Sequence, residues 1–138
     1  MMTPLRLVDE LNRLHEYLSL DNFELRNGLK DDPILILVAI TDSNRTYGLE
    51  VNLKGYPESK PSMCVLEELH KRDGSKMTCS GAMHCLGTQK GRTYICHCSS
   101  WRPDTHLINL YFKGKLWLEA YEGHLETGKP IDYYLKHQ

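Results

Sequence analysis

Apolar residues recur with two different periods along this chain of 138 residues, and the order of the two periods limits the fold. The first period, of three or four residues, is typical of an amphipathic helix; it runs through Leu5, Val8, Leu11, Leu14 and Leu18. Thr3 followed by Pro4 is typical of a helix N-terminus, because threonine caps the first turn and proline fits the first helical position. We therefore predict an opening helix that ends near Ser19.

The second period, of two residues, predicts β-strands after this helix. Short segments there alternate in hydrophobicity or are rich in β-branched residues; they cover residues 23–25, 33–40, 46–53 and 63–66. Asp42, Ser43 and Asn44 are turn-forming residues between the second and third segments. A run of neighbouring strands joined by short turns predicts a four-stranded antiparallel meander.

A long segment without a sustained period separates the strands from a second helix. It covers residues 67–102 and is rich in Gly, Cys, His and Ser, so we expect an active-site loop there. Helical spacing resumes at His106 and continues to Leu125, and Gly128 with Pro130 supplies a stop. The chain is thus predicted to be one α+β domain over residues 1–138, with an N-terminal helix, the meander, the loop and a C-terminal helix.

Charge and hydropathy narrow the classes of function. Lys and Arg number 17 against 18 Asp and Glu, so the chain lacks the basic field that draws proteins to nucleic acid. The longest apolar stretch, residues 34–40, is far shorter than the roughly 20 residues that cross a bilayer, and the N-terminus lacks a signal-peptide pattern. We expect a cytoplasmic protein without a nucleic-acid partner or a membrane anchor.

The chain has five cysteines, which cannot all pair with one another, and this favours a reduced, cytosolic setting. They are Cys64, Cys79, Cys85, Cys96 and Cys98. A thiolate is the side-chain nucleophile most available near neutral pH, and positive charge beside it favours the thiolate form. His84, Arg92 and His97 are the candidates for that charge near Cys96 in the sequence.

The order of motifs in the chain resembles that of the ubiquitin-conjugating enzymes. In that family a Tyr-Pro-x-x-x-Pro segment precedes the fourth strand, and a histidine segment precedes the catalytic cysteine. The matching stretches here are Gly55-Tyr56-Pro57-Glu58-Ser59-Lys60-Pro61, then His84, then Gly91-Arg92-Thr93-Tyr94-Ile95-Cys96, then Trp101-Arg102-Pro103. The resemblance covers about residues 5–125 and implies the fold of that family.

The resemblance also implies roles for individual residues. Cys96 is expected to carry a protein or peptide carboxyl end as a thioester, and His84 to organise the loop around it. His97 is a second-rank participant, because adjacent residues of an extended segment point to opposite sides. Cys98 is a neighbour that could resolve an oxidised Cys96 or share its acyl group. No cofactor and no metal are expected.

Two departures from the family pattern point to a subgroup. The family's asparagine after the histidine has no counterpart, because Cys85 follows His84, and the chain ends soon after its second helix. Both features are similar to the compact bacterial members of cyclic-oligonucleotide antiphage signalling systems (CBASS). That similarity implies a cGAS-like nucleotidyltransferase as the partner that supplies its C-terminal carboxylate. The sequence leaves open whether an activating enzyme supplies this acyl group or the protein takes it directly.

Three alternatives stay open on the sequence alone. A zinc site would draw on Cys79, His84, Cys85, Cys96, His97 and Cys98, although the chain has no Cys-x-x-Cys knuckle. A cysteine hydrolase would need an Asn or Asp to orient its imidazole, and none stands in an evident place. A binding scaffold that has lost catalysis would be compatible with the missing asparagine.

Overall fold

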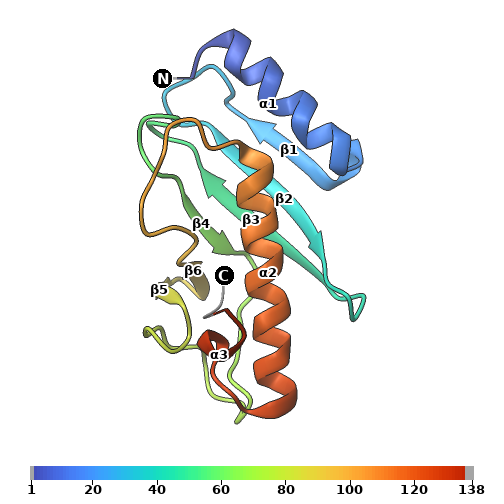
Figure 1. The fold of residues 1–138 in the computed structure, drawn as a ribbon, viewed down its shortest axis with the longest axis vertical. Helices are drawn as coiled ribbons and strands as arrows, with labels where there is room; N and C mark the ends of the chain where they lie inside the picture. Colours follow the sequence, from blue (N-terminus) through green and yellow to red (C-terminus); the bar gives the residue numbers. More distant parts are fainter. Residues whose placement is uncertain (1, 136–138) are drawn as a thin grey trace.

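The computed structural model describes residues 2–135, in which a six-stranded antiparallel sheet is covered by helices (Figure 1). The elements in chain order are α1 (Pro4–Tyr17), a 3₁₀ turn η1 (Leu20–Asn22), β1 (Phe23–Arg26), β2 (Ile34–Ile40), β3 (Thr46–Asn52), β4 (Ser62–Val65), β5 (Cys85–Gln89), β6 (Arg92–Ile95), α2 (Leu107–Thr127) and α3 (Ile131–Leu135). The strand order is β1-β2-β3-β4-β6-β5. The predicted α+β class is confirmed, and so is the meander of the first four strands.

Helix α1 has the predicted start but a different buried face. The Thr3 hydroxyl accepts a hydrogen bond from the backbone of the first turn, as the sequence predicts. Leu5 and Val8, however, are 85% and 55% exposed, whereas Glu10 and Leu14 are fully buried. The predicted period is correct and the predicted face is wrong at its N-terminal end, because a carboxylate takes a core position there.

The core lies between one face of the sheet and α2, which runs across that face (Figure 1). Alternate residues of β2, namely Leu35, Leu37 and Ala39, are completely buried, and Leu37 is paired with Leu49 of β3. Trp117 of α2 is also buried. Burial of each leucine side chain in this layer contributes about 1.5–3 kcal/mol to the stability of the fold, so the layer holds α2 against the sheet.

The expectation of an irregular loop over residues 67–102 is wrong in its second half, where β5 and β6 form a hairpin. Lys90 and Gly91 make its turn with φ angles of 53° and 78°, the left-handed values that two-residue hairpin turns require. Strand β6 also pairs with β4, with Cys64 opposite Tyr94. The hairpin is therefore part of the main sheet.

The C-terminal helix ends where the sequence predicts and is followed by one more helix. Gly128 adopts a left-handed φ of 80° and caps α2. Helix α3 then turns back, with Ile131 completely buried and the Tyr134 ring packed close to Gly123 of α2. Within residues 2–135, no helix combines the length and apolar character that crossing a bilayer requires.

Candidate active site

The β5–β6 hairpin places two of the predicted residues side by side. Cys85 and Ile95 are the pair that closes its open end. His84 and Cys96 are the next residues outward, and the Cys96 backbone N–H donates to the His84 carbonyl at 3.1 Å. Residues 12 apart in sequence are thus neighbours because the turn between them is tight.

The backbone around His84 is held from several sides. His84 has a φ of 50°, a left-handed value that is uncommon for a residue with a side chain. Its carbonyl also accepts a hydrogen bond of 2.9 Å from the indole Nε1 of the buried Trp117. The role of loop organiser that the resemblance implies for His84 stays a prediction, and these bonds are consistent with it.

All four residues selected from the sequence line one cavity of about 230 Å³. Its lining consists of His84, Cys96, His97, Cys98, Ser99, Lys113, Leu116, Trp117 and Leu135. The lining combines two thiols, two imidazoles and the ammonium group of Lys113 with apolar walls. A cavity of this composition can receive the end of an acyl chain and present it to a thiol.

Asp132 is a site residue that sequence reasoning missed. Its Oδ1 lies 2.7 Å from Nε2 of His84, and its backbone N–H donates to the Ala82 carbonyl at 2.8 Å. The two bonds fasten α3 to the turn that carries His84. Asp132 is the kind of orienting residue for which the hydrolase alternative had no evident candidate in the sequence. No local pattern signals this contact, because His84 and Asp132 are 48 positions apart and helix α3 is not predicted from the sequence.

His97 is a hydrogen-bonded, neutral imidazole rather than a source of positive charge. Its Nε2 lies 2.7 Å from the Pro61 carbonyl, which can only accept, so Nε2 donates. Burial lowers the pKa of His97, and the positive charges of Lys60 and Lys113 lower it further. The proposal that His97 provides positive charge beside Cys96 is therefore not supported.

Arg92 also does not serve the site. Its guanidinium is 3.0 Å from the Glu50 carboxylate, with which it makes an ion pair, and it does not line the cavity. Lys113 is the cation that does line the cavity. It projects from α2.

The five cysteines differ sharply in state. Cys79 and Cys85 form a disulfide, so the expectation of a fully reduced chain is wrong. Cys64 is buried in β4, and burial raises the pKa of its thiol, with the Glu50 carboxylate adding to the effect. Cys96 and Cys98 are the free cysteines that retain some exposure. Thiol reactivity is therefore concentrated at the cavity.

Cys98 sits on a short segment that is tied to its surroundings. Its Sγ donates to the Ser100 carbonyl at 3.0 Å, and its own carbonyl accepts from Lys60 Nζ at 3.0 Å. Trp101, three residues on, donates its indole N–H to the Pro57 carbonyl and packs against the Tyr56 ring. Trp101 thus packs against the Tyr56-Pro57 turn, whose peptide bond is cis.

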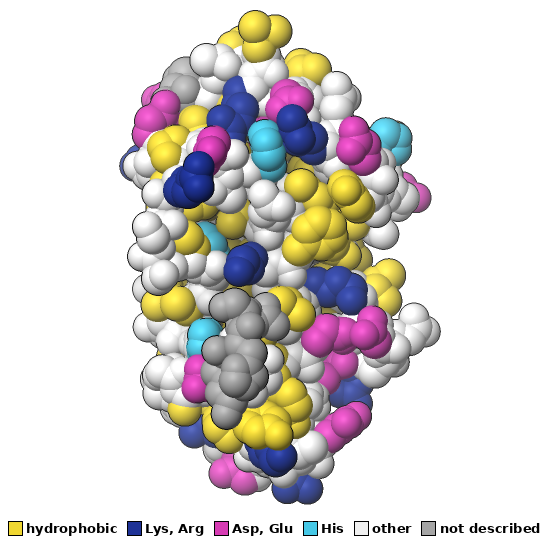
Figure 2. All heavy atoms as spheres, in the orientation of Figure 1, with side chains coloured by type: hydrophobic (Ala, Val, Ile, Leu, Met, Phe, Trp, Pro, Cys, Tyr) yellow, Lys and Arg dark blue, Asp and Glu magenta, His cyan; other side chains and the backbone are white. Residues whose placement is uncertain are grey.

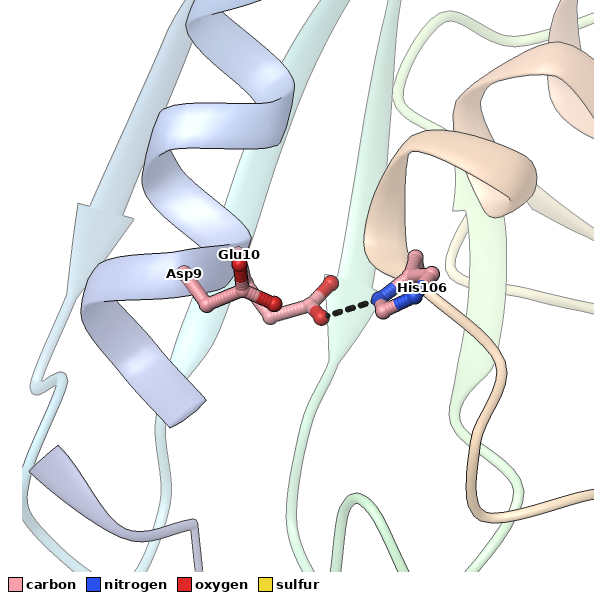
Figure 3. A group of neighbouring side chains, drawn as sticks. All are labelled: Asp9, Glu10 and His106. Carbon is pink, nitrogen blue, oxygen red and sulfur yellow. Dashed lines mark hydrogen bonds and ion pairs between the residues drawn. The ribbon is translucent and has the colours of Figure 1, made fainter. Parts of the chain in front are cut away.

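The zinc alternative finds no ligand set at this cavity. Among residues 2–135, one group of potential metal ligands converges. It consists of Asp9, Glu10 and His106, and it lies where α1 meets the N-terminus of α2 (Figure 3). Glu10 accepts from His106 Nδ1 at 2.7 Å and from the Leu107 N–H at 2.6 Å, and it pairs with Arg6 at 3.0 Å. Its oxygens are already occupied, so this cluster is a structural junction between α1 and α2.

Comparison of the chain with known protein families, curated proteins and solved structures finds no match. A function is therefore argued from the residues and geometry of this chain alone. The arrangement of a partly exposed thiol, an imidazole with a carboxylate partner and an ammonium group around one cavity is suited to acyl transfer.

Proposed function

We propose that this protein is a ubiquitin-conjugating-like carrier that holds an acyl group as a thioester on Cys96. The observation that carries the proposal is the placement of the Cys96 thiol in a cavity together with His84 and Lys113. In the loading step, the Cys96 thiolate attacks a donor thioester, a new C–S bond forms at the acyl carbon, and the donor thiolate leaves. Such an exchange is nearly balanced in energy, which suits a carrier.

The element order supports a ubiquitin-conjugating-like fold as part of this proposal. Helix α1 comes first, strands β1 to β4 follow as a meander, and a cysteine directly after β6 precedes the long helix α2. The Tyr56-Pro57 turn lies beside Trp101 in the segment after Cys96. These features lie in the order that the family resemblance implies.

The surface beside the cavity offers a place for a protein donor. Phe112 and Leu116 of α2 are 44% and 37% exposed, and Tyr17 of α1 makes an edge-to-face contact with Phe112. Figure 2 shows apolar side chains gathered over the middle of α2 on this face. We propose that the donor is the C-terminus of a cGAS-like nucleotidyltransferase in bacterial antiphage defence. The protein would then act in the cytoplasm, with an activating enzyme as the source of the thioester.

The loading step is testable without the natural donor. A short synthetic peptide with a C-terminal glycine, supplied as its 2-mercaptoethanesulfonate thioester, is mixed with purified protein and followed by intact-mass spectrometry. We expect a mass increment equal to the peptide acyl group, which dithiothreitol removes. Cys96→Ala should abolish the increment, whereas Cys98→Ala, the matched control from the same cavity, should retain it.

Two results would contradict the proposal. One is a wild-type protein that gains no acyl group at concentrations where free cysteine does. The other is equal loading of wild type and Cys96→Ala, which would show that the peptide reacts with thiols without selection. Either result would favour a scaffold that binds partners through the same fold without carrying an acyl group.

A further inference from the structure

We propose that His84 and Asp132 form a proton-accepting pair that serves the discharge of the acyl group from Cys96, with Asp132 as the positioning residue. This inference rests on the proposed carrier function. It adds a catalytic base and its orienting carboxylate to a site for which the sequence implied only a loop-organising histidine.

The hydrogen bond between the two residues fixes the tautomer of the imidazole. A carboxylate at this distance, 2.7 Å, accepts a hydrogen bond, so Nε2 of His84 carries the proton. Nδ1 is then the nitrogen with a free lone pair. His84 and Cys96 line the same cavity. In this proposal, the lone pair therefore serves a nucleophile that approaches an acyl group on Cys96.

The position of Asp132 is set by packing rather than by the ion pair alone. Its backbone N–H is bonded to the Ala82 carbonyl, and its neighbour Ile131 is completely buried. Tyr134, two residues after Asp132, lies against Gly123 and donates to the Gly123 carbonyl at 3.2 Å. These contacts hold the backbone that carries the Asp132 carboxylate before any substrate binds. Such a fixed position is the condition for an effective orienting group.

The discharge step balances with these groups. A neutral amine attacks the thioester carbonyl, an N–C bond forms, the C–S bond breaks, and Cys96 leaves as a thiolate. The proton that the amine nitrogen loses goes to Nδ1 of His84, and the Asp132 carboxylate stabilises the resulting imidazolium without accepting the proton itself. The imidazolium then returns its proton to the thiolate or to water.

Other charged and titratable groups face the same cavity and must be separated from the pair in any test. They are Cys96, His97 and Cys98 from the segment after β6, and Lys113 from α2. The Nε2 of His97 is committed to Pro61. His97 is therefore the natural comparison for His84: both are imidazoles on the cavity wall, but only His84 has a carboxylate partner.

The test is a single-turnover measurement on protein loaded with the glycine-ended peptide described above. Excess peptide is removed, Nα-acetyl-lysine amide is added, and loss of the acyl group from Cys96 is followed by mass spectrometry at neutral pH. We expect Asp132→Asn to load normally and to discharge at least about tenfold more slowly, because the asparagine amide no longer fixes the Nε2–H tautomer.

Three further variants make the result specific. Asp132→Glu should restore part of the rate, and Asp104→Asn, a change of the same type at an exposed position, should discharge like wild type. His84→Gln, which removes the proposed base, should discharge about as slowly as Asp132→Asn. For each variant, a near-ultraviolet circular dichroism spectrum that matches the spectrum of wild type shows that the fold is retained.

The outcomes distinguish this inference from the proposed function. If wild type loads but Asp132→Asn discharges at the same rate, the pair has no catalytic role and the carrier function stands. If Asp132→Asn is slow and Asp132→Glu restores none of the rate, the role of Asp132 is structural and the inference is overturned. If wild type never loads, the carrier function itself is contradicted.

Discussion

Glu10 connects the two longest helices through a carboxylate that is completely buried. One oxygen caps the N-terminus of α2 by accepting from the Leu107 N–H, and the other lies between Arg6 and His106, as Figure 3 shows for His106. Arg6 also donates to the Tyr56 hydroxyl at 2.8 Å. This one residue therefore links α1, α2 and the turn that carries Tyr56.

Removal of this carboxylate should be costly. In Glu10→Ala, the buried Leu107 N–H loses its acceptor, and Arg6 and His106 lose the carboxylate between them, although Arg6 keeps its hydrogen bond to Tyr56. We expect the free energy of unfolding to fall by about 3–5 kcal/mol, measured by urea denaturation. Glu16→Ala changes an exposed glutamate of the same helix and should change stability by less than about 0.5 kcal/mol. Equal effects of the two changes would refute the junction role of Glu10.

His97 should make stability depend on pH. Burial lowers its pKa in the folded protein below the value of about 6.5 in the unfolded chain, so the unfolded chain binds more protons as the pH falls. Stability is therefore greatest above about pH 6.5 and decreases as the pH falls below it. We expect His97→Gln to show a smaller loss of stability than wild type between pH 7.5 and pH 5.5 in urea titrations. A loss of the same size in both proteins would show that His97 is not responsible.

At the scale of elements, the β5–β6 hairpin and α3 together shape the cavity. The hairpin sets His84 beside Cys96, and α3 brings Asp132 to His84. The disulfide between Cys79 and Cys85 closes the short loop that leads into the hairpin, and Cys85 is adjacent to His84 in the chain. The bond therefore restrains the backbone on which His84 depends.

Loss of this disulfide should lower the free energy of unfolding by the amount expected for a bond that closes a short loop. The cysteines are 6 residues apart, and closure of so small a loop stabilises by about 2 kcal/mol in the chain-entropy treatment. We expect the double variant Cys79→Ser, Cys85→Ser to lose about this much unfolding free energy. Wild type in dithiothreitol should match the double variant, and Cys98→Ser should not. A double variant as stable as oxidised wild type would contradict the expectation.

At the scale of the whole molecule, periodicity predicted the elements that bury the most apolar surface. Helix α2 and strands β2 and β3 have long, regular patterns, and their positions follow from the sequence. The β5–β6 hairpin was missed because Gly87 interrupts β5 at a register shift and the turn residues are Lys90 and Gly91 rather than a stronger turn pair. Its place in the sheet depends on pairing with β4, which no local pattern encodes.

The site was predictable to the extent that it is local in sequence. His84, Cys96, His97 and Cys98 lie within one segment, and the structure gathers them around one cavity. Lys113 and Asp132 arrive from α2 and α3, so their contribution depends on tertiary packing. The disulfide was likewise not predictable, because whether two cysteines approach each other is decided by the path of the loop between them.

The most direct test of the carrier function is intact-mass spectrometry of the protein recovered from cells that produce it naturally, with and without dithiothreitol. We predict a reductant-labile mass increment on wild type, whose size identifies the cargo. Cys96→Ser should carry the same acyl group as an ester that dithiothreitol does not remove, and Cys96→Ala should carry none. An unmodified mass for all three proteins, or the same increment on Cys96→Ala as on wild type, would contradict a thioester on Cys96.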